Sequence, residues 1–398
     1  MPTPLKHDLY IRGTREEAAR QDFVASLRGF VLNDVANDMR KQFDDSVAPK
    51  LEKDGKTPAS GPEVHKAMRS EPLFRFYSSM RYNTQEMVWR SVLRPLAGER
   101  ENLGQRIDNA SNGGPGGTLT LDPALPIPKN VTEIDVHLTP GCYHREDNDA
   151  PWMGGAVYDH GLNVFAFGMM GENHDDIGLS MSQFIRHKFP DFKPQNVLDL
   201  GCTIGHNTCA WKLTYPDAEV TGIDVAPACL RYGHARAERQ GVAVHFRQAN
   251  ATDLPYEDNS QDVVFSSMFL HELSVKDIRK VFAEAHRVLR PGGLMLHMEL
   301  PPNDSLTPYD AFYLDWDAYY NNEPFYKKFR DQDIGKLREE AGFAPENHLQ
   351  FITPQYSTMS DEAYDEAIQE AAGFSDKTGR LAEGIQWFGF GAWKGDAQ

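Results

Sequence analysis

The stretch from residue 196 to residue 206 constrains the fold of this chain more than any other. It is apolar through Val197, Leu198 and Leu200, and it then turns at Gly201 and Gly205. An apolar run of this length that ends in a glycine turn predicts a buried parallel strand, a tight loop and a helix start. Asp199 lies at the end of the strand, so a ligand that approaches the loop meets a carboxylate.

A second predicted strand, residues 219–223, ends just before Asp224. In nucleotide-binding sheets, an acid about 20 residues beyond the glycine turn holds the ribose hydroxyls. The alternation of helix and strand then continues, with further strands predicted over residues 242–247, 261–266, 294–300, 348–355 and 385–393. The predicted fold class is therefore α/β, with a parallel sheet covered by helices on both faces.

Five short motifs resemble, in the same order, those of class I S-adenosylmethionine-dependent methyltransferases. They are Asp199 to Gly205, Asp224, Asn250 to Pro255, Phe269 to Leu273, and Leu289 to Gly293. The nearest branch acts on small molecules and includes the ubiquinone and menaquinone biosynthesis enzymes. The resemblance implies a Rossmann-like sheet, mostly parallel with an antiparallel last strand, and S-adenosylmethionine as the cofactor.

The resemblance also assigns residues to that cofactor. It implies a methionyl end lined by Asp199, Gly201, Thr203 and Gly205, a ribose held by Asp224, an adenine beside Ala251 and Asp253, and a sulfonium bordered by Ser267 and Met268, with Val225 and Thr252 completing the set. Asp253 has an alternative role as a turn former before Pro255. Thr203 replaces the usual glycine, so we expect its backbone to occupy an ordinary region with negative φ.

The candidate catalytic residues are His271, Glu272 and Glu299, which the predicted sheet places at the carboxyl ends of its strands. His271 has the intrinsic pKa for proton transfer near neutrality, although it is equally a helix-start residue that shapes a loop. Glu299 either orients the substrate or pairs with a nearby cation. No metal site is predicted, because the sequence shows neither grouped carboxylates after the fourth strand nor paired cysteines.

The segment from residue 308 to residue 328 is rich in aromatic residues. In the resembling family this position commonly builds the acceptor pocket, and aromatic walls suit a small planar or lipophilic acceptor. The alternative is an amphipathic helix that packs on the sheet. The predicted activity is methyl transfer from S-adenosylmethionine to a small aromatic or lipophilic acceptor.

The chain divides into three predicted parts. Residues 1–105 form a helical region that caps the site or mediates homodimerisation, residues 106–170 form a Gly- and Pro-rich linker with an aromatic lid, and residues 171–398 form the cofactor domain. Thr14 and Glu17 predict a capping box, and apolar residues recur at helical spacing between Phe23 and Phe43. Residues 131–138 predict one extended strand.

Composition narrows the function classes. The chain has 398 residues and a net charge of -17 that is widely spread, which disfavours nucleic acid and anionic membranes as partners. The absence of a signal core, of a membrane-spanning run and of a disulfide pattern among its four cysteines predicts a cytoplasmic protein with reduced thiols.

Two other function classes remain open at this point. A nicotinamide-dependent dehydrogenase shares the strand, the glycine turn and the acid, but it requires a third glycine that is missing here. A non-catalytic cofactor-binding or scaffold protein would act through its N-terminal region, because likeness of fold does not prove turnover.

Overall fold

The computed structural model describes residues 5–110, 114–145, 147–375, 377–381 and 384–395. The three predicted parts of the chain therefore extend in places beyond the described residues. Among those residues, no helix combines the length and the apolar character that crossing a membrane requires. Cys142, Cys202, Cys209 and Cys229 are buried and free.

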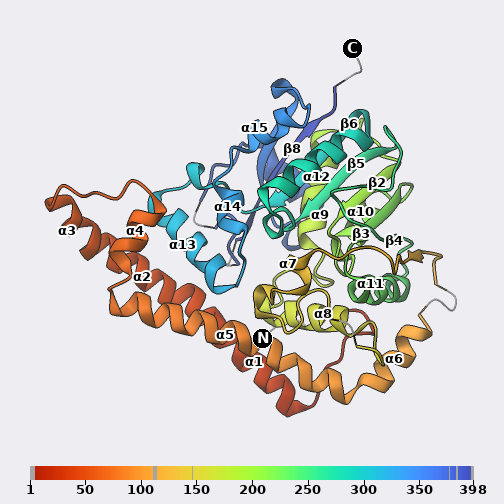
Figure 1. Cartoon of the computed structure of the whole chain (residues 1–398), viewed down its shortest axis with the longest axis horizontal. Coiled ribbons are helices and arrows are strands. Elements are labelled where there is room, and N and C mark those ends of the chain that lie inside the picture. Colours follow the sequence, from red (N-terminus) through yellow and green to blue (C-terminus); the bar gives the residue numbers. More distant parts are fainter. Residues whose placement is uncertain (1–4, 111–113, 146, 376, 382–383, 396–398) are drawn as a thin grey trace.

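One mixed sheet of eight strands organises the described chain (Figure 1). The strands are β1 (Thr118–Thr120), β2 (Asn196–Leu200), β3 (Glu219–Asp224), β4 (His245–Gln248), β5 (Gln261–Ser267), β6 (Leu289–Glu299), β7 (His348–Pro354) and β8 (Gln386–Trp393). Their order is β1-β4-β3-β2-β5-β6-β8-β7, and only β8 runs antiparallel to its neighbours. The predicted sheet, mostly parallel with an antiparallel last strand, is confirmed.

Helices cover both faces of this sheet. The helices from residue 129 onward are α7 (Lys129–Thr132), α8 (Met153–Phe165), α9 (Asp176–Lys188), α10 (His206–Thr214), α11 (Pro227–Gln240), α12 (Val275–Val288), α13 (Pro308–Tyr320), α14 (Tyr326–Arg330), α15 (Ile334–Glu340) and α16 (Asp361–Gln369). Buried residues of α9, α10 and α11 pack on one face and those of α12, α13 and α15 on the other. Each face of the apolar strands thus has its own core, as expected for a doubly covered sheet.

The helix α12 illustrates how local sequence sets an element. Its N-cap, Ser274, accepts a hydrogen bond from the amide of Asp277. Ile278, Val281 and Phe282 then recur at helical spacing, and all are fully buried against the sheet. The cap fixes the start of the helix, and the apolar stripe fixes the face that packs.

The N-terminal region forms a separate helical layer, which crosses the lower part of Figure 1. It contains α1 (Arg15–Phe30), α2 (Ala36–Gln42), α3 (Ala48–Lys53), α4 (Gly61–Met68), α5 (Pro72–Gly98) and α6 (Arg100–Asp108), with π-helical turns η1 (Val31–Val35) and η2 (Phe43–Val47) between the first three. Val88 and Val92 of α5 pack with Ala156 and Val157 of α8, and α8 in turn packs on α11. The helical layer is therefore joined to the cofactor domain through α8.

The structure corrects three local predictions. The capping box of Thr14 and Glu17 is present, but Phe23 and Phe30 are 58% and 49% exposed, because α1 buries Val24 and Arg28 instead. Residues 131–138 are not a strand: the end of α7 is followed by a turn and the 3-10 helix η3 (Val136–Leu138). The predicted linker contains β1, which pairs only with β4 at the edge of the sheet.

His297 gives the fold a measurable sensitivity to acid. It lies fully buried in β6, stacked on Phe282, with its Nδ1 2.7 Å from the hydroxyl of Ser266. Burial lowers its pKa from 6.5 to about 3. The folded protein therefore holds His297 neutral at a pH where the unfolded chain protonates it, so stability falls as the pH drops below about 6.5.

We expect His297→Asn to weaken this dependence. Between pH 6 and pH 4.5 its unfolding free energy should fall less steeply than that of the wild type, by about 1.4 kcal/mol per pH unit, which corresponds to one proton. Urea unfolding at a series of pH values measures both slopes. Parallel slopes for the two proteins would contradict the neutral state of His297.

Candidate active site

A cavity of about 280 Å³ lies between the carboxyl ends of the parallel strands and the N-terminal helices. Of the residues predicted to bind the cofactor, eight line it: Asp199, Gly201, Thr203, Asp224, Val225, Ala251, Ser267 and Met268. These residues lie at or just beyond the carboxyl ends of β2, β3, β4 and β5, where open α/β sheets bind their ligands. Gly205, Thr252 and Asp253 do not line the cavity.

The three residues outside the cavity have other positions. Gly205 is the N-cap of α10 with φ 71°, and the space beside it is filled by the ring of Phe246. Thr252 donates from both its amide and its hydroxyl to Asn250, and Asp253 is exposed. Asn250 is the polar residue of this loop that lines the cavity.

Two buried aspartates shape the loop after β2. Asp224 accepts hydrogen bonds from the amides of Thr203 and Ala226, both at 2.9 Å. Asp199 accepts from the hydroxyl of Thr208 at 2.6 Å, and burial raises its pKa to about 7. Each carboxylate oxygen of Asp224 keeps a lone pair for a further donor, such as a ribose hydroxyl.

Thr203 has the backbone conformation that we did not expect of it. Its φ is 49°, in the left-handed region, whereas a threonine was predicted to avoid positive φ. The hydrogen bond from its amide to Asp224 holds the strained turn in place. Such strain costs about 1–2 kcal/mol and persists where surrounding contacts determine the backbone.

Gly201 is irreplaceable for a steric reason as well as a conformational one. Its φ is 66°, and a Cβ at this position would lie 2.2 Å from the ring of Phe269. We expect Gly201→Ala to weaken cofactor binding at least tenfold, because the turn must move out of register with Asp199. Isothermal titration with S-adenosylhomocysteine measures this.

Gly241 supplies the matched control for that substitution. It also has a positive φ, 74°, but nothing lies within 4 Å of its added Cβ. Gly241→Ala should therefore cost about 1 kcal/mol of backbone strain and leave cofactor affinity unchanged. Equal losses of affinity in the two variants would show that strain alone, and not the contact with Phe269, sets the requirement for glycine.

The predicted catalytic residues His271 and Glu299 form a hydrogen-bonded pair. His271 donates from Nδ1 to Glu299 at 2.6 Å, and the other oxygen of Glu299 accepts from the amides of Phe269 and Leu270. Burial opposes the charged imidazole, yet Glu299 raises the pKa of His271 to about 9. His271 lines the cavity and Glu299 does not, so Glu299 is a positioning residue that fixes the ring.

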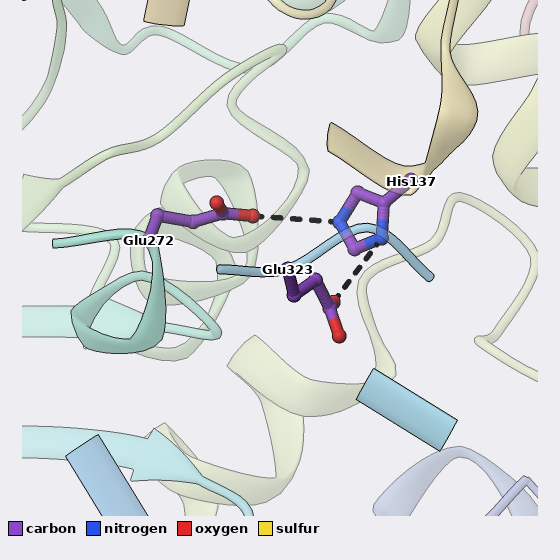
Figure 2. A group of neighbouring side chains, drawn as sticks. All are labelled: His137, Glu272 and Glu323. Carbon is purple, nitrogen blue, oxygen red and sulfur yellow. Dashed lines mark ion pairs between the residues drawn. The ribbon is translucent and has the colours of Figure 1, made fainter. Parts of the chain in front are cut away.

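Glu272 belongs to a cluster that the sequence analysis missed (Figure 2). His137 lies between two carboxylates, with Nε2 3.5 Å from Glu272 and Nδ1 3.2 Å from Glu323. All three line the cavity, and one donor atom from each lies within 4.8 Å of the other two. The fold thus brings together one imidazole and two carboxylates, which are side chains that commonly bind metals. No metal site was predicted from the sequence.

Electrostatics couple these groups to one another. Burial raises the pKa of Glu323 to about 7 and opposes the charge on His137, whose pKa is nevertheless raised by Glu323. Glu272 accepts from the hydroxyl of Tyr143 at 3.2 Å. No sequence signal could have joined these residues, because they come from η3, from the end of the 3-10 helix η4 (Leu270–Glu272) and from the turn after α13.

The N-terminal helices also contribute to the cavity wall. Arg28 of α1 lines the cavity, fully buried, and its Nε donates to the carbonyl of Phe165 at 3.0 Å. Its Nη1 has no hydrogen-bond partner among the described residues. Arg81 of α5 forms an ion pair with Asp317, another cavity residue. The sequence analysis did not identify Arg28 or Arg81 as cavity residues, because both lie in a region without recognised motifs.

An unpaired polar atom marks the position for a polar ligand near the glycine turn. His206 lines the cavity, and its Nδ1 is buried with no hydrogen-bond partner among the described residues. Burial lowers the pKa of His206 to about 3, so the ring is neutral. Together with Asp199 and Asp224, it gives the donor and acceptor groups that an amino acid linked to a nucleoside requires.

Comparisons with known proteins agree with this geometry. A family model described as a methyltransferase domain matches residues 197–293. A demethylmenaquinone methyltransferase from Thermus thermophilus is 31% identical over 193 residues, which cover 48% of this chain and 80% of that protein. A malonyl-acyl-carrier-protein O-methyltransferase from Hahella chejuensis is 40% identical over 103 residues, covering 26% of this chain and 36% of that protein.

Among solved structures, phosphoethanolamine N-methyltransferase 2 from Haemonchus contortus in complex with S-adenosyl-L-methionine is 19% identical. The match covers 54% of this chain and 52% of the other chain, with a TM-score of 0.38.

Arg28, His137 and Glu323 all lie outside the range that the family model matches.

Proposed function

Because this chain belongs to the class I S-adenosylmethionine-dependent methyltransferases, we propose that it methylates a small aromatic or lipophilic acceptor held beside the cofactor. The observation that carries the proposal is a single cavity lined both by the loops after β2 and β3 and by the residues around α13. Bound S-adenosylmethionine supplies an activated methyl group, so the protein has to position the acceptor and exclude water.

The cofactor would be held by the residues that line the cavity at the strand ends. We assign Asp224 and Val225 to the ribose, Asp199 and Thr203 to the methionyl end, and Ala251 to the adenine. Ser267 ends β5 and Met268 follows it, and we assign both to the sulfonium. The assignments of Gly205, Thr252 and Asp253 find less support, since these residues lie outside the cavity.

The chemical character of the acceptor follows from the remaining walls. Leu162, Phe165, Leu300, Tyr313 and Leu314 line the cavity and favour an apolar, planar body. Arg28, His271 and the cluster around His137 add polar groups on the same walls. We infer an acceptor that joins an apolar body to one or two oxygen, nitrogen or sulfur atoms.

We assign the contact with the acceptor's reacting atom to His271. Its Nδ1 is held by Glu299, and Tyr326 stacks on its ring at 3.9 Å between ring centres. The remaining nitrogen, Nε2, lies within 4 Å of Glu272 and Glu323 on the cavity side. With a pKa of about 9 the ring is protonated at neutral pH, so it would orient the acceptor by donating a hydrogen bond from Nε2.

The test is methyl transfer from isotopically labelled S-adenosylmethionine to a panel of acceptors. Demethylmenaquinone comes first because a relative bears its name, followed by phenols and small aromatic acids. Labelled product that disappears in Asp224→Ala supports the proposal. Saturable cofactor binding without transfer to any member of a broad panel would instead favour the scaffold alternative. The matches to named methyltransferases argue against that alternative.

Three earlier expectations belong with this proposal: the three-part division of the chain, a cytoplasmic location and a homodimer. The exposed rings of Phe23 and Phe30 on α1 support the dimer, because large apolar side chains in water favour association. Light scattering after gel filtration would decide it, with Phe23→Ser and Phe30→Ser together expected to yield a monomer.

A further inference from the structure

We propose that His137, Glu272 and Glu323 bind a divalent transition-metal ion inside the cavity. Binding of the ion does not depend on the function proposed above, whereas its role in methyl transfer rests on that function. The three side chains are 17%, 14% and 3% exposed, and they meet at one point of the wall from three separate segments (Figure 2).

The donor atoms lie close enough together to share one ion. One donor atom of each residue lies within 4.8 Å of the other two. The two nitrogens of His137 lie 3.5 and 3.2 Å from Glu272 and Glu323, and an ion would bind one of these nitrogens and replace its contact with the carboxylate. Ligands about 2.1 Å from a tetrahedral ion lie about 3.4 Å from one another, so the three side chains would draw closer when the ion binds.

The backbone holds His137 in place for this role. Its φ is 56°, in the left-handed region, and its carbonyl accepts from Gln85 at 2.9 Å and from Trp89 at 2.6 Å. Both donors belong to the long helix α5. A residue that is strained and anchored at the same time is typical of a binding site assembled in advance.

The carboxylates are held in a similar way by outer contacts. Tyr143 donates to Glu272, and Asn321 donates to Glu323 at 3.0 Å. Supporting hydrogen bonds of this kind orient the ligands of metal sites. The cluster is therefore fixed from outside, and its inner atoms remain directed at one another.

An unpaired atom beside the cluster also favours a cation. The Oδ1 of Asn321 is buried with no hydrogen-bond partner among the described residues, while its Nδ2 lies 2.7 Å from Nδ1 of His137. Turning this amide over would exchange its hydrogen bond to Glu323 for an oxygen ligand to the ion. A buried amide oxygen without a donor is costly, and a cation removes that cost.

The donor set selects the class of metal. One imidazole with two carboxylates suits zinc, manganese, iron or cobalt, whereas magnesium and calcium prefer oxygen ligands alone. Three protein ligands leave an open position, as in catalytic zinc sites. In this cavity that position would hold an oxygen or sulfur atom of the acceptor and lower its pKa, so that this atom would lose its proton to water more readily.

Cobalt(II) is the probe, because its visible absorption reports its ligands. The full-length protein is stripped with a chelator and titrated with Co²⁺, followed by absorption and by calorimetry. We expect one equivalent to bind, and affinity to fall at least 30-fold in both Glu323→Gln and His137→Gln. Glu133→Gln is the control, because Glu133 lies near His137 in sequence but is exposed and paired with Lys129.

Binding of S-adenosylhomocysteine to each variant checks that the variant is folded. Should the two variants fail to fold, X-ray absorption of the Co²⁺-loaded wild type takes their place, with one imidazole among oxygen ligands as the expected result. The proposal is overturned if the wild type shows no saturable Co²⁺ binding up to millimolar concentration, or if folded Glu323→Gln binds Co²⁺ as tightly as the wild type. Metal binding without methyl transfer would count against the proposed function alone.

Discussion

Asp224→Ala is expected to weaken binding of S-adenosylhomocysteine at least 100-fold. The carboxylate lies buried at the end of β3, and each of its oxygens already accepts one backbone amide. Two further hydrogen bonds from ribose hydroxyls to a charged acceptor contribute about 3–4 kcal/mol together, which corresponds to a loss of roughly 100- to 1000-fold. The substitution also releases the amide of Thr203, so the strained turn loses the contact that holds it.

Isothermal titration against S-adenosylhomocysteine gives the two dissociation constants directly. Glu219→Ala is the matched control, since Glu219 begins the same strand at its opposite end, is exposed and contacts the half-buried His245. This control should bind as the wild type does. If the affinity of Asp224→Ala for S-adenosylhomocysteine falls less than tenfold, Asp224 does not hold the ribose, and another residue of the cavity must do so.

Glu299→Ala is expected to have the largest effect on stability. The substitution would leave the amides of Phe269 and Leu270 and the Nδ1 of His271 buried without their acceptor. Breaking a buried pair of this kind costs about 3–5 kcal/mol. For a chain of this size we expect the melting temperature to fall by roughly 5–10 °C.

Glu299→Gln separates positioning from stability. The amide oxygen of glutamine still accepts from the two backbone amides. Its NH2 group cannot accept the hydrogen bond that His271 donates, so the ring loses its fixed orientation. We expect kcat to fall about 100-fold, with cofactor affinity unchanged and a smaller loss in melting temperature. A variant with wild-type kcat would show that Glu299 serves the fold alone.

Asp262→Asn provides the comparison. Asp262 also accepts two successive backbone amides, those of Gln195 and Asn196, but it lies at the amino end of the sheet. The melting temperature of this variant should fall, while its kcat should stay as in the wild type. Comparison of the Asp262 and Glu299 variants then shows whether the loss of kcat depends on the position of the carboxylate near the cavity.

The parts of the fold that sequence reasoning predicted well depend on local rules. The apolar run of β2 is buried on both faces, Ser274 caps α12 as expected, and Asp224 ends β3. In each case neighbouring residues decide the outcome, since burial of a strand and capping of a helix use groups a few residues apart. The position of Gly201 in the cavity wall follows from the same local rules, because a glycine turn comes directly after the buried strand β2.

The parts that escaped prediction depend on contacts between distant segments. His137 and Glu323 meet only because α5 holds one loop and α13 ends beside another. The positive φ of His137 and Thr203 leaves no trace in a pattern of apolar residues. Residues 131–138 were therefore predicted as a strand, although they contain the end of α7 and the 3-10 helix η3. Arg28 reaches the cavity from a helix whose exposed phenylalanines obscured which face it buries.

The share of the cavity wall that α1 and η1 contribute has an evolutionary consequence. Arg28, Leu32 and Asn33 face the same space as the cofactor loops, yet they lie in a region that the family model does not match. Substitutions there can alter which molecule fits without disturbing any cofactor motif. Two descendants of one ancestor could therefore keep identical motifs and serve different metabolic routes, and their divergence would be recorded in the first hundred residues.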